Sequence, residues 1–282
     1  MATQLKASAE AGVKPALTSP TSGTVASGDG TRIAFETSGT GPPLVLVAGA
    51  LGFKEFSYLR KFAAEFAKSF RVFSYDRRGR GGSTDTKPYS VDKEVDDLAA
   101  VCREAGGPPI VVGISSGAAL ALEAATRGVQ MNHLVAYEAP YMIGSHRRPE
   151  HARYEADLTN LLARNDRDGA VKLFMRTVGV PGFLLAIMRI MPFWKDFRRV
   201  AHTLPYDAAV MGGFELPASR LGRIRVPTLV VGGGKSPPNL KAAVRAVADA
   251  VPDAQLEEIP KQSHAIKASA LVPVVRRFVQ ES

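Results

Sequence analysis

The chain has 282 residues, of which 45% are hydrophobic and 22% charged, a composition typical of a globular protein with one large or two modest domains. Its formal net charge is +9, but the arginines, Arg77, Arg78 and Arg80 among them, form no run of five or more and no nucleic-acid motif. A solvated basic surface is therefore favoured over a nucleic-acid partner. The longest apolar stretch, Gly182 to Met188, is too short to cross a membrane, and the single cysteine, Cys102, excludes an intramolecular disulfide.

The first residues indicate a loose tail followed by an antiparallel pair. Residues 1–23 are rich in Ala, Ser, Thr and Lys and have no apolar core of a secretory signal, so we expect a flexible tail and a cytoplasmic protein. Val25 to Ser27 and Arg32 to Thr37 flank Gly28-Asp29-Gly30. A Gly/Asp cluster between two such runs predicts a hairpin.

Two apolar runs then predict strands that alternate with helices. Leu44 to Val47 enters a glycine loop from Ala48 to Gly52, and residues 53–69 carry apolar side chains at helical spacing. Phe70 to Tyr75 predicts the next strand. Ser90 is placed to cap a helix that runs to about Ala105.

The stretch from Pro109 to Arg127 is the most informative part of the sequence. The β-branched run Ile110 to Val112 meets Gly113-Ile114-Ser115-Ser116-Gly117, and an Ala/Leu-rich helix follows at once. In a strand–turn–helix setting, a G-x-S-x-G motif predicts a nucleophile elbow, a strained turn that exposes the serine hydroxyl above the sheet. The competing interpretation of Ser115 is an ordinary helix N-cap.

The remaining sequence alternates again after a long helical interruption. Residues 133–137 predict a strand that ends at Glu138, whereas helical patterns dominate from residue 139 to about 225, at 154–164, 169–178, 181–190 and 195–203. A strand at 227–231, a helix at about 239–251, a strand at about 255–259 and a last helix at about 271–280 follow. We expect an α/β fold: a mostly parallel eight-stranded sheet formed by residues 24–138 and 226–282, helices on both faces, and a helical cap at 139–225 inserted after the sixth strand.

These features together resemble the α/β-hydrolase superfamily, and the resemblance covers about residues 24 to 280. Tyr75 to Gly81 (Tyr-Asp-Arg-Arg-Gly-Arg-Gly) and Tyr137-Glu138-Ala139-Pro140 resemble motifs of its capped, single-domain serine hydrolases. The resemblance implies a cofactor-free enzyme, but one fold hosts many reactions.

A serine nucleophile needs a base and an orienting carboxylate. His264 lies in a loop after the last strand, where the fold's chain order of Ser, acid, His puts the base; His133, His146, His151 and His202 are weaker candidates. Many relatives place the acid after the strand that here runs into Gly232-Gly233-Gly234-Lys235-Ser236, which holds no carboxylate. Glu138, at the end of the preceding strand, occupies a second position known in the superfamily, and we predict it as the acid; pairing with an arginine is the competing role.

The oxyanion hole is expected from two backbone amides, those of Ser116 and, by resemblance to the usual His-Gly-x loop, Ala50, with Leu51 as an alternative for the second. Ala48 stands where the usual His would. The cap is expected to wall the site with apolar side chains, about half of them facing the substrate. The predicted pocket residues are Leu51, Tyr141, Met142, Phe183, Ile187, Met188, Met191 and Trp194.

We therefore predict a serine hydrolase that forms an acyl-enzyme with a small, largely apolar ester, lactone, thioester or activated amide. Carbon–carbon hydrolysis, lyase chemistry or cofactor-free peroxidation by the same residues remains an alternative, as does a non-catalytic small-molecule binding or pathway protein. The expected partner is a small-molecule substrate, without nucleic acid or membrane; the sequence leaves the oligomeric state open. His146 and His151 lack nearby Cys or acid partners, so no metal site is predicted.

Overall fold

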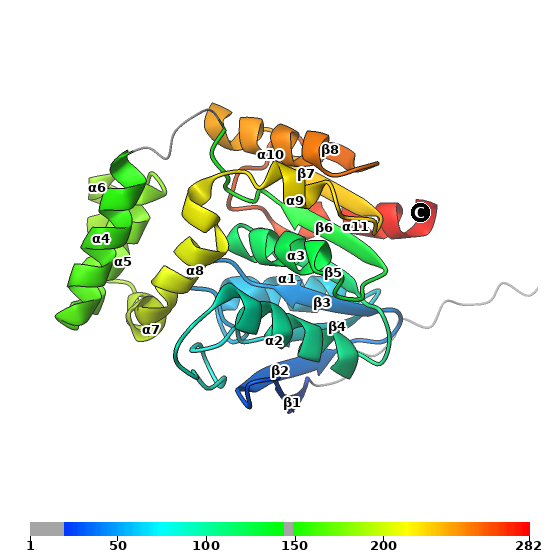
Figure 1. Cartoon of the computed structure of the whole chain (residues 1–282), viewed down its shortest axis with the longest axis horizontal. Helices are drawn as coiled ribbons and strands as arrows, with labels where there is room; N and C mark the ends of the chain where they lie inside the picture. The colour runs from blue at the N-terminus through cyan, green and yellow to red at the C-terminus, as the bar shows by residue number, and fades with distance from the viewer. Residues whose placement is uncertain (1–19, 144–148) are drawn as a thin grey trace, which may run out of the picture.

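The computed structural model describes residues 20–143 and 149–282, and only the backbone of residues 149–152. Eight strands form one sheet in the order β1-β2-β4-β3-β5-β6-β7-β8 (Figure 1). β1 and β2 pair antiparallel, β2 is antiparallel to β4, and all later pairs are parallel. The strands are β1 (Thr21–Ala26), β2 (Arg32–Ser38), β3 (Pro43–Val47), β4 (Arg71–Tyr75), β5 (Ile110–Ile114), β6 (His133–Tyr137), β7 (Thr228–Gly233) and β8 (Gln255–Ile259). The predicted fold class is confirmed.

Helices cover both faces of this sheet. α2 (Val91–Glu104), α3 (Ser116–Thr126) and α10 (Pro238–Ala250) pack on one face, and α1 (Ser57–Phe66) and α11 (Ala268–Glu281) pack on the other. The Ser90 hydroxyl accepts a hydrogen bond from the Lys93 amide at 3.3 Å, which is the N-cap expected for α2.

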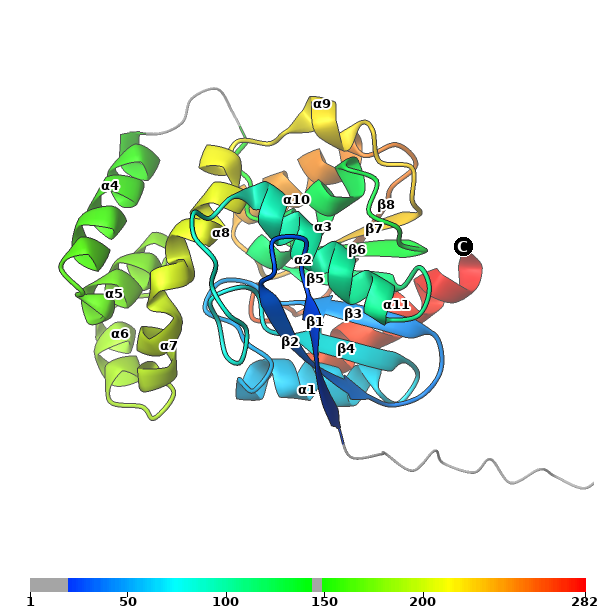
Figure 2. The ribbon, with the colours of Figure 1, turned by 60° about the horizontal axis from the view of Figure 1, so that its bottom comes forward.

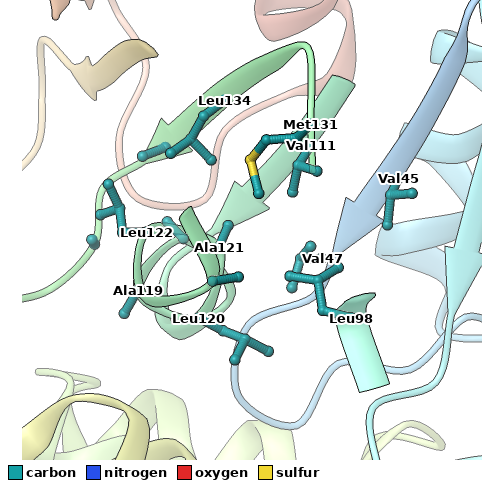
Figure 3. Packing of buried hydrophobic residues seen from close by; sticks show 14 of the residues in the cluster. Val45, Val47, Leu98, Val111, Ala119, Leu120, Ala121, Leu122, Met131 and Leu134 are labelled. Atoms are coloured by element: carbon teal, nitrogen blue, oxygen red, sulfur yellow. The ribbon is translucent and has the colours of Figure 1, made fainter. Parts of the chain in front are cut away.

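The continuous apolar strands are explained by burial on both faces. Side chains alternate along a strand, so Val45 and Val47 of β3 join the core under α2 and α3, whereas Leu44 and Leu46 join the core under α1 and α11. Figure 3 shows the first of these cores, in which Leu120 of α3 and neighbouring side chains pack against β3 and β5. The central strands are thereby held rigidly, together with the loops at their carboxyl ends.

Between β6 and β7 the chain forms a lobe of helices that both views place beside one end of the sheet, with α8 between the lobe and the sheet (Figures 1 and 2). A separate apolar cluster holds this lobe together, and it includes Leu51 and Phe53 from the loop after β3. The helices of the interruption are α4 (Pro149–Ala163), α5 (Arg167–Thr177), α6 (Gly182–Arg189), α7 (Trp194–Val200), α8 (Leu204–Val210) and α9 (Ala218–Leu221).

The structure differs from the expected organisation in three places. β1 begins at Thr21, so three residues assigned to the tail pair with β2; residues 1–19 lie outside the described residues. α8, which the sequence analysis did not predict, starts with Pro205 in its first turn, a recognisable start signal. The last part of the predicted cap, including Val210, Leu221 and Ile224, packs into the core under α3 rather than into the lobe.

Candidate active site

Ser115 lies at a strained turn between β5 and α3. Its φ and ψ are 58° and −127°, a conformation that costs a non-glycine residue on the order of 1–3 kcal/mol. The turn is tight because the helix packs directly on the sheet: a Cβ added to Gly113 would lie 2.5 Å from the Ala118 Cα, and one added to Gly117 would lie 2.3 Å from the Val47 carbonyl oxygen. The geometry is that of a nucleophile elbow.

His264 contacts both Ser115 and Glu138. Its Nε2 lies 3.1 Å from the Ser115 Oγ, and its Nδ1 lies 2.8 Å from the Glu138 Oε2. Both distances are within hydrogen-bonding range. The three side chains come from β5–α3, the end of β6 and the loop after β8, and form one continuous chain from hydroxyl to carboxylate.

The Glu138 carboxylate is fully buried, and its second oxygen is also occupied. Oε1 accepts a hydrogen bond from the Gly233 amide at 2.7 Å. Burial acts to raise the pKa of Glu138, but the hydrogen bonds from His264 and Gly233 outweigh it and bring the pKa below its ordinary value. The carboxylate is therefore ionised at neutral pH, as an orienting acid requires.

The glycine run at the end of β7 supports this carboxylate instead of supplying one. A Cβ on Gly233 would lie 2.7 Å from the Gln262 carbonyl oxygen, so only glycine fits between β7 and the His264 loop. The Lys235 amide donates to the same carbonyl at 2.7 Å. The sequence analysis noted the absence of an acid here but missed this role, for which three consecutive glycines were the available signal.

Two tyrosines hold the loop that carries His264. The Tyr137 hydroxyl donates to the Ser263 carbonyl at 2.6 Å, and the Tyr58 hydroxyl donates to the Ile266 carbonyl at 3.0 Å. Burial and the nearby Glu138 charge raise the pKa of Tyr58 to about 12, so it remains a donor at neutral pH. The sequence analysis named Tyr137 only as part of a motif and Tyr58 not at all, and it predicted this role for neither, because each binds a carbonyl far away along the chain.

The two segments that carry the predicted oxyanion donors both reach the Ser115 turn. Ser116 begins α3, and amides of a helix's first turn have no partner within the helix. The loop after β3 approaches from the other side, since a Cβ on Gly49 would lie 3.0 Å from the Ser115 Cβ. Ala50 follows in that loop, and Leu51 is buried with a φ of 59°.

The basic motif after β4 is buried, so the prediction of a solvated basic surface is wrong for Arg77, Arg78 and Arg80. Each is at most 1% exposed. Arg78 pairs with Asp97 of α2 through two contacts of 2.7 Å, while Arg77 and Arg80 both pair with Asp207 of α8. Their charges are neutralised by carboxylates distant in sequence, which composition does not reveal.

The predicted pocket residues fall into three groups. Leu51 and Trp194 are buried in the lobe's own cluster, with Met188 packed against it, and the Trp194 Nε1 donates to Asp168 at 2.7 Å. Tyr141 is buried under α3, and Met142 is half-buried beside it. Phe183, Ile187 and Met191 are 73%, 51% and 38% exposed, so they form no buried wall in this structure.

The surface has a hollow of about 360 Å³ between α4 and α5. A second hollow, of about 540 Å³, is lined by α10 together with Ile143 and Ser236. Ser115 lines neither of them.

His133 and His202, the other histidines whose side chains are described, are not part of this chain of hydrogen bonds. The His133 ring packs edge-on against Phe278 with both nitrogens buried and unpartnered, and burial lowers its pKa. His202 lies 4.0 Å from Asp85. His146 is outside the described residues, as is the His151 side chain. Within the described ranges no cluster of His, Cys, Asp or Glu could hold a metal, and no helix is long and apolar enough to cross a membrane.

A strained serine turn, a histidine on its hydroxyl and a carboxylate on that histidine, all at the carboxyl ends of parallel strands, define the site of an α/β hydrolase. A profile described as the alpha/beta hydrolase family matches residues 44–273. An alpha/beta hydrolase from Sphaerobacter thermophilus DSM 20745 is 43% identical, with a TM-score of 0.85 over 91% of this chain and 100% of that chain. The chain belongs to the alpha/beta hydrolase family.

Two further proteins are similar at lower sequence identity, one of them over a shorter part of the chain. The enol-lactonase from Burkholderia xenovorans LB400 is 23% identical, with a TM-score of 0.67 over 92% of this chain and 100% of that chain, a likeness of fold. A Mycobacterium tuberculosis (strain ATCC 25618 / H37Rv) protein, BpoC, provisionally named a non-heme bromoperoxidase, is 31% identical over 93 residues, 33% of this chain. The chain matches 36% of that relative's length.

Proposed function

We propose that this protein is a serine hydrolase in which Ser115 is the nucleophile, His264 the general base and Glu138 the orienting acid. The observation that carries the proposal is the unbroken hydrogen-bond chain from the Ser115 Oγ through both nitrogens of His264 to a buried carboxylate. A serine hydroxyl is a weak nucleophile, and such a chain is what activates it.

Each step uses groups at this site. The Ser115 Oγ attacks the substrate carbonyl carbon while His264 Nε2 takes the hydroxyl proton, and the amides of Ala50 and Ser116 stabilise the resulting oxyanion. The protonated His264 then gives its proton to the leaving group, which leaves an acyl group on Ser115. His264 deprotonates a water that attacks this acyl group, and it returns the proton to the Ser115 Oγ as the bond between Oγ and the acyl carbon breaks and the acid product leaves. Glu138 remains ionised throughout and stabilises the imidazolium.

The substrate we propose is a small, largely apolar ester, lactone, thioester or activated amide. An apolar cluster joins the lobe to the loop after β3; it includes Leu51 and Trp194, and Met188 and Ala50 of the proposed oxyanion hole pack against it. Apolar walls favour an acyl group or ring system over a sugar or phosphate.

The test is covalent labelling combined with turnover. A fluorophosphonate probe should label wild-type protein at Ser115, and p-nitrophenyl esters of graded chain length should be hydrolysed, with a preference that reports the size of the acyl pocket. Ser115→Ala should abolish both signals without altering the melting temperature by more than a few degrees, because the turn is set by its backbone. Labelling without turnover would point to one of the other reactions this fold supports. Absence of labelling in folded wild-type protein would overturn the nucleophile assignment.

A further inference from the structure

Asp207 connects the cap to the residue that follows the proposed nucleophile. Its Oδ1 accepts a hydrogen bond from the Ser116 hydroxyl at 2.8 Å and another from the Arg77 Nη1 at 2.6 Å, and its Oδ2 accepts one from the Arg80 Nη2 at 2.7 Å. Burial acts to raise the pKa of Asp207, but the two guanidinium charges and the Ser116 hydroxyl bring it below its ordinary value. Asp207 is therefore a buried, charged acceptor.

The same two arginines hold the loop after β3. Arg80 Nη1 donates to the carbonyl oxygens of Gly49 at 2.7 Å and Gly52 at 3.2 Å, and Arg77 Nη1 lies 3.3 Å from the Ala48 carbonyl oxygen. Arg80 Nε also donates to the Thr203 hydroxyl of the cap at 3.0 Å. The arginines therefore connect the cap to backbone carbonyl groups along this loop.

The contact with the Gly49 carbonyl has a direct consequence for the oxyanion hole. The Gly49 C=O and the Ala50 N–H belong to one planar trans peptide unit and point in opposite directions. A hydrogen bond that fixes the Gly49 carbonyl therefore fixes the Ala50 N–H as well. In parallel, the hydrogen bond from the Ser116 hydroxyl to Asp207 restrains the residue whose amide is the other proposed donor.

We propose that Asp207 is a positioning residue of the cap that orients both oxyanion donors, the Ser116 amide through the Ser116 hydroxyl and the Ala50 amide through Arg80. This inference rests on the proposed function, since it assigns the two amides to the oxyanion. It also explains why a buried ion network spans the junction between the cap and the loop after β3: through this network the cap completes the catalytic geometry.

Ser116→Ala isolates this role because it removes the hydroxyl but keeps the amide and every ion pair. Loss of a whole oxyanion donor lowers kcat by roughly 100–1,000-fold; a donor that remains but is less well oriented should lower kcat by about 10-fold, with KM changed less than about threefold. Ser74→Ala is the matched control, because Ser74 is also buried and its hydroxyl has no partner. It should leave kcat unchanged.

Asp207→Asn, compared with Asp97→Asn, tests whether Asp207 orients the Ala50 amide through Arg80. Both aspartates are buried partners of motif arginines, but Asp97 binds Arg78, which does not contact the loop after β3. Both variants should melt at lower temperature, whereas only Asp207→Asn should lower kcat by more than about 10-fold at a temperature where both remain folded. Equal losses of kcat in the two variants would show a merely structural role and overturn the proposal.

Amide hydrogen exchange gives a readout that is independent of turnover. Exchange in the segment 48–52 should be faster in Asp207→Asn than in wild type, exchange of the amide of residue 116 should be faster in Ser116→Ala, and both should be unchanged in Ser74→Ala and Asp97→Asn. Unchanged exchange in all four variants would overturn the positioning role even if the wild type proved inactive on every ester. Failure of the proposed function would instead appear as absent Ser115 labelling in wild-type protein.

Discussion

Replacement of Glu138 by glutamine tests the assignment of the acid most directly. The substitution preserves the size and shape of a side chain that is fully buried. The Gly233 amide donates to Oε1 at 2.7 Å, so this position accepts the amide oxygen of the introduced glutamine and not its NH2 group. The NH2 group is consequently directed at His264 Nδ1, 2.8 Å away in the wild type. Because the new group donates, Nδ1 must accept, and the proton moves to Nε2.

That tautomer cannot take the proton of the Ser115 hydroxyl, since Nε2 already carries one. In serine proteases the equivalent acid-to-amide change lowers kcat by about 10,000-fold through the same exchange of tautomer. We expect a loss of about 1,000 to 10,000-fold here, which corresponds to roughly 4 to 5.5 kcal/mol of transition-state stabilisation. KM should change little, because Glu138 is fully buried.

The assay is steady-state hydrolysis of the best p-nitrophenyl ester, with Lys235→Ala as the control. Lys235 lies in the loop where relatives carry their acid, but its side chain is not part of the hydrogen-bond chain. A Glu138→Gln variant that retains more than a tenth of wild-type kcat while folded would refute the reasoning and leave a Ser115–His264 dyad.

Three further outcomes are expected. Gly233→Ala should lower both kcat and the free energy of unfolding, the latter by about 1–3 kcal/mol, because its Cβ meets a backbone carbonyl at 2.7 Å. In Gly232→Ala the Cβ meets only a side chain, at 3.2 Å, so the free energy of unfolding measured in urea should fall less. Tyr137→Phe should lower the free energy of unfolding by about 1 kcal/mol and kcat several-fold, because it frees the His264 loop; unchanged kcat would contradict this. The folded pKa of Glu138 lies below its ordinary value of 4.5, so its carboxylate contributes stability above that pH and loses it as pH falls through the folded pKa. The stability difference between wild type and Glu138→Gln, measured by urea unfolding, should therefore shrink from about pH 6 to about pH 3.

Local signals in the sequence were sufficient for the elements that depend on neighbouring residues. The run from Ile110 to Gly117 predicts strand, turn and helix because each residue's preference is satisfied within a few positions. Ser90 caps its helix for the same reason. The position of Glu138 was predicted from a resemblance, since nothing local distinguishes a carboxylate that orients a histidine from one that pairs with an arginine.

What the sequence by itself determined was the order of the strands and of most helices, together with Ser115 and His264 as candidate reactive residues, because patterns of hydrophobicity and turn residues are local. Tertiary structure alone decided which charges are buried together and which backbone groups hold them. Asp207 meets Arg77 and Arg80 across about 130 residues, and Gly233 meets Glu138 across 95. Such pairs form because a buried charge or amide needs a partner, and the fold decides which residue lies within reach. The partner therefore cannot be inferred from its separation along the sequence.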